Sequence, residues 1–160
     1  MLRRKQCTFI EPGAKHYEFG QYNQHFCSDS LKWPAAVLKA LQHARAASET
    51  PSLYNGVHVN LYTDGGVGVE PHSDKEDSMV QGKEIYSYTL LEDPSCPRPF
   101  SVYNRDKTKI LDVALGHGDM LVMRGLMQQL YLHGVEKVRP YTAYKSRINL
   151  TVRAFEGFTN

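Results

Sequence analysis

The alternation of apolar and polar positions divides the chain into one helix followed by a series of short strands. Residues 35–47 come after Pro34, which is tolerated at a first helical position, and Val37, Leu38, Leu41 and Ala44 share one helical face. This face predicts a helix packed against a sheet. The period then changes to two, which predicts strands over residues 57–62, 84–91, 100–103, 109–114, 119–123, 129–133 and 147–155. One helix before many strands predicts an antiparallel sandwich or barrel.

The last expected strand has two chemically uniform faces. Four polar residues alternate with four apolar ones, and the polar set is Arg147, Asn149, Thr151 and Arg153. The strand at residues 57–62 repeats the pattern, with His58, Asn60 and Tyr62 on its polar side. Two interpretations stay open, because such faces either meet water or line a common cavity. A cavity with two arginines requires an anion, and a small dicarboxylate is one natural occupant.

Composition and charge are those of an ordinary globular protein. The 160 residues are 41% hydrophobic and 22% charged, which predicts one domain over residues 1–160 and excludes disordered and fibrous classes. The net charge of +2 is too small to imply wholesale phosphate binding. Arg3, Arg4 and Lys5 are interpreted as a solvated, flexible terminus.

Cysteine usage and hydropathy predict the compartment. The odd set Cys7, Cys27 and Cys96 contains no C-x-x-C pair, which argues against a disulfide framework or a zinc site and favours a reducing environment. No apolar stretch approaches the about 20 residues that span a bilayer, and the N-terminus lacks a secretory signal. We therefore expect a cytoplasmic or nuclear protein with no membrane partner.

Three residues form a candidate metal site. In an extended segment His72 and Asp74 lie on the same side and can meet one ion, although an isolated H-x-D also fits ordinary loop hydrogen bonds. His133, at the end of an expected strand, supplies a second imidazole. Two imidazoles and one carboxylate leave three positions open on iron(II), whereas zinc more often has a closed shell. His117 lies in a Gly-His-Gly turn, and the histidines without ligand-like companions are His16, His25 and His43. We expect His58 to line the pocket without touching metal.

The order of these motifs resembles the AlkB family of 2-oxoglutarate- and iron(II)-dependent dioxygenases. H-x-D at residues 72–74 and His133 precede R-x-N-x-T-x-R at 147–153, and the likeness includes residues 17–19, 33–34, 60–62 and 116–123. The resemblance implies a mainly β (α+β) fold, a double-stranded β-helix or jelly roll with one buttressing N-terminal helix. Residues 57–155 would form the catalytic core and residues 1–30 the substrate-lid region.

The resemblance also implies residue roles. His72, Asp74 and His133 would bind iron(II), which uses dioxygen, and Arg147 would grip the distal carboxylate of 2-oxoglutarate. Asn60, Tyr62 and Asn149 would complete that pocket, and Arg153 would orient both Asp74 and the metal-proximal carboxylate of 2-oxoglutarate. Glu76 would read the exocyclic amino group of a damaged base, and Tyr17, Phe19 and Tyr22 would stack on it. A solvated carboxylate and core packing are the competing interpretations, and for Trp33 core packing is preferred.

The implied reaction is oxidative demethylation of bases such as 1-methyladenine or 3-methylcytosine, releasing formaldehyde, succinate and carbon dioxide. Because the chain begins almost at the lid, single-stranded DNA or RNA is the expected partner, bound by a monomer. Tyr86 and Tyr88 stand where relatives carry small residues, and we expect them to narrow the pocket. This keeps open the same chemistry on a protein side chain or small molecule. A non-catalytic nucleic-acid-binding module is the third alternative.

Overall fold

The two strands with mixed faces lie side by side in the middle of a six-stranded sheet. The computed structural model describes residues 4–14 and 25–157. In this structure β3 (Tyr54–Tyr62) runs antiparallel to β10 (Arg147–Ala154). Their register pairs His58 with Thr151, Asn60 with Asn149, and Tyr62 with Arg147. The polar residues of both strands therefore share one face of the sheet.

Two sheets make up the fold. The larger has the order β2-β1-β3-β10-β5-β8 and the smaller has the order β4-β9-β6-β7. The remaining strands of the larger sheet are β1 (Lys5–Ile10), β2 (His25–Cys27), β5 (Ile85–Leu91) and β8 (Met120–Met123). Those of the smaller sheet are β4 (Val69–His72), β6 (Arg98–Tyr103), β7 (Lys109–Leu115) and β9 (Leu132–Val135). The pairing is antiparallel throughout these two sheets except between β1 and β2.

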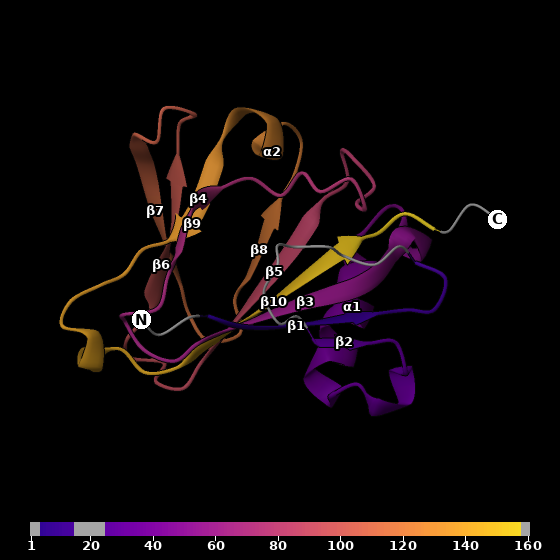
Figure 1. The fold of residues 1–160 in the computed structure, drawn as a ribbon, viewed down its shortest axis with the longest axis horizontal. Helices are drawn as coiled ribbons and strands as arrows, with labels where there is room; N and C mark the ends of the chain where they lie inside the picture. The colour runs from indigo at the N-terminus through magenta and orange to yellow at the C-terminus, as the bar shows by residue number, and fades with distance from the viewer. Residues whose placement is uncertain (1–3, 15–24, 158–160) are drawn as a thin grey trace.

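The one long helix among the described residues covers the side of the larger sheet that faces away from the smaller one (Figure 1). This helix, α1 (Ala35–Ala47), starts directly after Pro34 and ends before Ser48, and its buried face holds Val37, Ala40, Leu41 and Ala44. That face packs in one cluster with the apolar face of β10 and with Trp33. Full burial of a Val or Leu side chain contributes about 1.5–3 kcal/mol. The predicted double-stranded β-helix with a buttressing helix is thus confirmed.

Some expected elements were wrong or missing. The strand expected at residues 129–133 is instead the one-turn helix α2 (Met127–Leu130) followed by β9. The amides of Gln129 and Leu130 both donate to the carbonyl of Leu126, which closes the helical turn. Strand β1 pairs along its length with β3, so a solvated, flexible terminus was the wrong interpretation from Lys5 onward.

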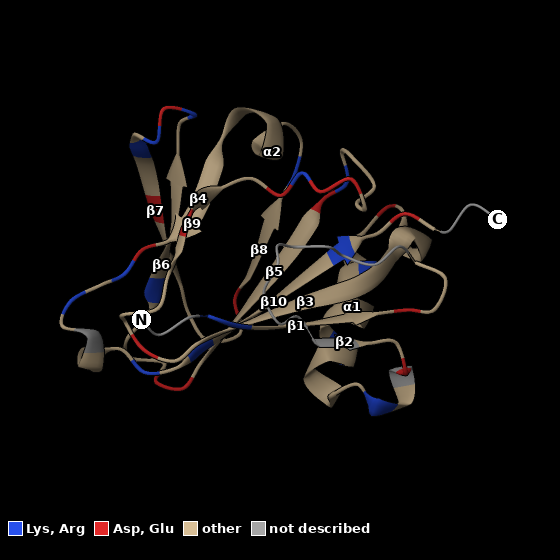
Figure 2. Ribbon diagram, viewed as in Figure 1, with Lys and Arg blue, Asp and Glu red and all other residues tan. Residues whose placement is uncertain are grey.

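Short turns connect these elements. Three are 3-10 helices, η1 (Ser30–Lys32), η2 (Pro51–Leu53) and η3 (Tyr141–Ala143). Among the residues described, no helix has both the length and the apolar character needed to cross a bilayer. The loops and hairpins carry both Lys or Arg and Asp or Glu positions (Figure 2), in keeping with the small net charge.

Candidate metal site

The polar faces of β3 and β10 line a cavity between the two sheets. Arg147, Asn149, Thr151 and Arg153 are all nearly inaccessible, at 1–8% exposure. The alternative that this face meets water is therefore excluded, and the cavity interpretation holds. Its walls are Arg4, Gln6, His58, Asn60, Tyr62, Val69, His72, Asp74, Ser87, Phe100, Met123, His133, Gly134, Val135, Arg147, Asn149, Thr151 and Arg153.

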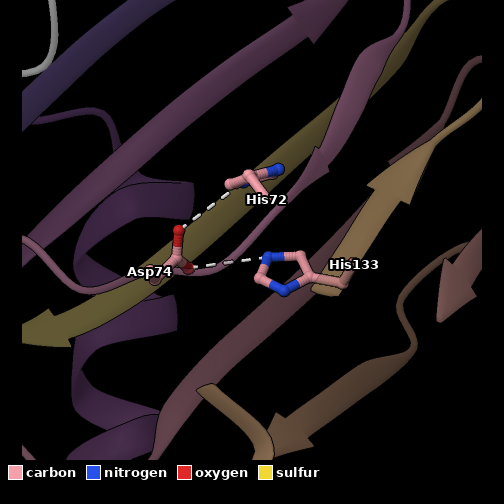
Figure 3. Close-up of side chains that lie close together, drawn as sticks. All are labelled: His72, Asp74 and His133. Carbon is pink, nitrogen blue, oxygen red and sulfur yellow. Dashed lines mark ion pairs between the residues drawn. The ribbon is translucent and has the colours of Figure 1, made fainter. Parts of the chain in front are cut away.

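His72, Asp74 and His133 converge in this cavity (Figure 3). His72 ends β4 and pairs directly with His133 of β9, and their ring centroids are 4.5 Å apart. Nε2 of His72 lies 3.6 Å from Oδ1 of Asp74, and Nε2 of His133 lies 3.7 Å from Oδ2. Two ligands that each sit about 2.1 Å from one ion are separated by no more than about 4.2 Å. The two measured separations therefore suit a single shared ion.

Close packing of β4 on β9 puts the two imidazoles opposite each other. A Cβ on Gly134 would lie 2.7 Å from the carbonyl oxygen of Val69, closer than real contacts allow. Phe100 stacks on the ring of His133 at a centroid distance of 5.2 Å. Nδ1 of His72 lies 2.9 Å from the carbonyl oxygen of Glu70. A proton on that nitrogen leaves the lone pair of Nε2 directed at the site.

The protonation states suit metal binding. Burial alone would raise the pKa of Asp74, but Arg153, whose Nη2 lies 2.8 Å from Oδ2, and the nearby histidines together outweigh burial, and the pKa falls to about 2. Burial lowers the pKa of His133 to about 4, with Asp74 acting in the opposite direction. At neutral pH the site therefore holds a carboxylate and a neutral imidazole, the forms that bind metals. Oδ1 of Asp74 accepts no hydrogen bond from the described residues.

Arg147 presents unused donors to the same cavity. Its Nη2 donates to Oγ1 of Thr89 at 3.2 Å, while Nε and Nη1 are buried and have no hydrogen-bond partner in the described chain. The guanidinium carbon lies 5.3 Å from the centre of the Tyr62 ring, and the guanidinium carbon of Arg98 lies 5.6 Å from the same ring. A buried guanidinium with open donors is costly unless an anion fills them. A carboxylate matches this fork.

Other predicted site residues have mixed outcomes. Asn60 and Tyr62 line the cavity, and so does Asn149. Both amide hydrogens of Asn149 are occupied, because Nδ2 donates to Ser87 and to the carbonyl of Tyr88. Glu76 is half-buried in the loop after Asp74 and is not a wall of this cavity. The expected lid residues Tyr17, Phe19 and Tyr22 lie outside the described residues.

The tyrosines after the metal motif do not narrow the cavity. Tyr86 and Tyr88 belong to the cluster under α1, where the Tyr88 hydroxyl bonds to His43 at 3.0 Å. The intervening residues Ser87 and Thr89 face the other way, toward the polar strand face. The expected narrowing was wrong because the period-two alternation of β5 turns the bulky side chains away.

Sequence reasoning missed several residues of the site. Arg98 is almost completely buried, and its guanidinium donates to the carbonyls of Asp64 at 2.9 Å and Glu136 at 2.6 Å. Arg4 and Gln6 line the cavity from β1 and its start. Thr8, also on β1, contacts Nδ1 of His58 at 2.8 Å. The alternation of Gln6, Thr8 and Ile10 with Cys7 and Phe9 was the signal available for this strand.

Comparison with known proteins gives matches along most of the chain. Residues 4–153 match the sequence model of a family described as the 2OG-Fe(II) oxygenase superfamily. The human protein "Alpha-ketoglutarate-dependent dioxygenase alkB homolog 3" is 32% identical over 124 residues, which are 73% of this chain and 42% of the relative. Its mouse counterpart is 31% identical over 117 residues, covering 69% and 40%.

Two further matches are a viral replicase protein and a solved prolyl hydroxylase structure. "Replicase protein 1a" of Grapevine leafroll-associated virus 3 is 29% identical over 125 residues, which are 78% of this chain and 5% of the viral protein. A solved Trichoplax adhaerens prolyl hydroxylase, bound to a peptide of the hypoxia inducible factor oxygen degradation domain, has a TM-score of 0.46 and 17% identity. It covers 64% of this chain and 44% of that structure. The chain spans less than half the length of each curated relative.

Proposed function

This chain belongs to the 2OG-Fe(II) oxygenase superfamily, and we propose that it demethylates N-alkylated nucleobases in single-stranded DNA or RNA. The family uses iron(II), 2-oxoglutarate and dioxygen. The observation that supports the proposal best is one cavity holding both the His-Asp-His cluster and the open donors of Arg147.

The donor set fits iron(II). Two imidazole nitrogens and a carboxylate oxygen lie within 4.8 Å of one another, and Asp74, which contacts Arg153, has a lowered pKa and is ionised at neutral pH. Such a set occupies one face of an ion and leaves the opposite positions to other molecules. When bound, iron(II) with 2-oxoglutarate and dioxygen supplies an oxidant for a carbon–hydrogen bond, with succinate and carbon dioxide as coproducts. His72, Asp74 and His133 would hold the ion.

Arg147 would hold 2-oxoglutarate by its distal carboxylate. Nε and Nη1 have no hydrogen-bond partner in the described chain, and the guanidinium groups of Arg147 and Arg98 both lie near the Tyr62 ring. Two parallel N–H donors bind one carboxylate bidentately, which fixes the orientation of the diacid. Asn60 and Asn149 would form the walls beside it, and Asn149 would pack there without donating, because its amide hydrogens are already used.

The residues on the cavity side of β5 are small, so they do not narrow the pocket and leave room for a bulky planar substrate. Ser87 and Thr89 take the positions that point inward, while both tyrosines pack under α1. Glu76 would read the exocyclic amino group of the base after a rearrangement of its loop, and Tyr17, Phe19 and Tyr22 would supply stacking surfaces.

Two rival functions would use parts of the same site. The same chemistry on a protein side chain or small molecule needs the cavity and the metal site but no nucleic acid. A non-catalytic nucleic-acid-binding module needs neither the ionised Asp74 nor the unfilled donors of Arg147. Both features are costly for a protein that binds no metal and no diacid. They favour an enzyme over a binding module.

The test is a screen of single-stranded DNA and RNA carrying 1-methyladenine or 3-methylcytosine, with iron(II) and 2-oxoglutarate. We expect formaldehyde and restored base in equal amounts, and neither from His72→Ala. The matched control is His117→Ala, because His117 lies in the turn at residues 116–118 and, within the described chain, bonds only to the backbone of Leu91. Succinate without restored base would contradict the nucleobase substrate, and no turnover of 2-oxoglutarate would contradict the enzyme.

A further inference from the structure

We propose that Gln128 and Arg105 are positioning residues that hold the metal-binding loop from outside the coordination sphere. Gln128 lies on α2, and Arg105 lies on the hairpin between β6 and β7. Neither side chain lines the cavity around the metal cluster. The inference rests on the proposed iron site and adds the residues that keep its carboxylate in place.

Gln128 fixes the backbone of the carboxylate ligand. The amide of Asp74 donates to Oε1 of Gln128 at 2.8 Å, and Nε2 of Gln128 contacts Sδ of Met123 at 3.4 Å. Asp74 lies beyond the end of β4, so its amide has no strand partner, and a buried backbone donor needs one. Loss of this acceptor would allow the backbone to move, and the carboxylate would move with it.

Arg105 fixes the position of Gln128. Its Nη2 donates to the carbonyl of Gln128 at 2.7 Å, and its Nε donates to the carbonyl of Gln129 at 2.9 Å. Its Nη1 also lies 3.4 Å from Oγ of Ser73, the residue between the two ligands of the loop. One guanidinium therefore connects the hairpin, α2 and the metal-binding loop.

The helix needs this support. α2 has four residues and no side-chain cap at its N-terminus, and one turn of helix is unstable alone. The last carbonyls of a helix have no partners within it and attract a cation. Arg105 both ties the short helix to the hairpin and places a cation on its last carbonyls. It therefore acts on the metal through Gln128 and Asp74.

The neighbouring glutamine provides a matched control. Gln129 is exposed, and among the described residues only its backbone amide and carbonyl, not its side chain, make hydrogen bonds. Gln128→Leu removes the acceptor with little change in size, Gln128→Glu keeps an acceptor, and Gln129→Leu makes the same chemical change one position away. Lys107→Ala serves in the same way for Arg105→Ala, because both are long cationic side chains on one exposed hairpin.

The experiment measures the Kd of manganese(II) by calorimetry and the visible absorption of cobalt(II)-loaded protein, after circular dichroism has established that each variant is folded. We expect Gln128→Leu to weaken binding by about 10- to 100-fold, as for other groups that orient metal ligands, and to change the cobalt spectrum. Gln128→Glu should recover most of the affinity, and Gln129→Leu should match the wild type. Arg105→Ala should weaken binding, and combining it with Gln128→Leu should add little, because both act along one path.

Each result has a distinct meaning. Wild-type affinity and an unchanged spectrum in Gln128→Leu would overturn this inference while leaving the iron site intact. Equal losses in Gln128→Leu and Gln129→Leu would also overturn it, because only one of these side chains contacts Asp74. A wild-type protein that binds no divalent metal would overturn the proposed function and this inference together.

Discussion

Two buried arginines on β10 should differ sharply in how the same substitution affects the stability of the protein. Arg147 and Arg153 are 1% and 4% exposed, respectively, and both face the cavity. Arg153 contacts the carboxylate of Asp74, whereas two nitrogens of Arg147 lack partners in the described chain. We expect Arg147→Met to leave the metal-free protein as stable as the wild type, and Arg153→Met to destabilise it strongly.

The magnitudes follow from these contacts. Arg147→Met removes two buried donors that are unsatisfied, each of which costs about 1–3 kcal/mol. It also removes the charged hydrogen bond to Thr89, worth about 1.5–3 kcal/mol, and the contact with Tyr62, worth about 1–2 kcal/mol. These effects nearly cancel, so the free energy of unfolding should stay within about 1 kcal/mol of the wild type. Arg153→Met leaves a buried carboxylate without its cation, which costs about 3–5 kcal/mol.

The assay is urea unfolding of both variants without and with manganese(II) and 2-oxoglutarate. At 100 times its Kd, the diacid should stabilise the wild type by about 2.7 kcal/mol. Arg147→Met should lose this increment because its anion-binding fork is gone. The reasoning is refuted if the two variants are destabilised equally in the metal-free state, or if 2-oxoglutarate stabilises Arg147→Met as much as the wild type.

Two other predictions concern packing and pH. Gly134→Ala puts a Cβ 2.7 Å from the Val69 carbonyl oxygen, so β4 must shift. We expect calorimetry to show that metal affinity falls about 10-fold or more. The control Gly116→Ala should lose no affinity. Burial, helped by Arg153, lowers the pKa of His58 in the folded protein to about 3, whereas an unfolded histidine has a pKa of about 6.5. Below about pH 6.5 the unfolded state therefore binds more protons than the folded state. Metal-free stability should fall with pH from about 6.5 toward 3, at up to about 1.4 kcal/mol per pH unit from His58. Urea titrations near pH 7 and pH 5 should show that the free energy of unfolding falls less in His58→Gln than in the wild type. Equal falls in the two proteins would contradict this.

Strand periodicity predicted much of the site. The alternation in β10 was enough to group the four polar residues on one face and to put the apolar residues against a helix. Whether the polar face met water or a cavity depended on a second sheet, which pairs residues far apart in the sequence. The same alternation, applied to β5, is sufficient to turn Tyr86 and Tyr88 toward α1 and away from the cavity.

Other features left little local pattern. α2 spans one turn, which is too short for a helical period, and its apolar residues were compatible with a strand. Arg98 lies between Pro97 and Pro99, and its contacts are with backbone carbonyls from other parts of the chain. No residue type at a fixed spacing predicts such contacts. The same holds for Gln128, which reaches the amide of Asp74 across 54 positions.

Anomalous diffraction from crystals grown with manganese(II) and 2-oxoglutarate tests most directly whether this cavity is a metal and diacid site. We predict one strong manganese peak within bonding distance of His72, Asp74 and His133, with the distal carboxylate of the diacid bound by Arg147. A peak that involves other residues, a diacid bound away from Arg147, or no peak at saturating metal would contradict the assignment.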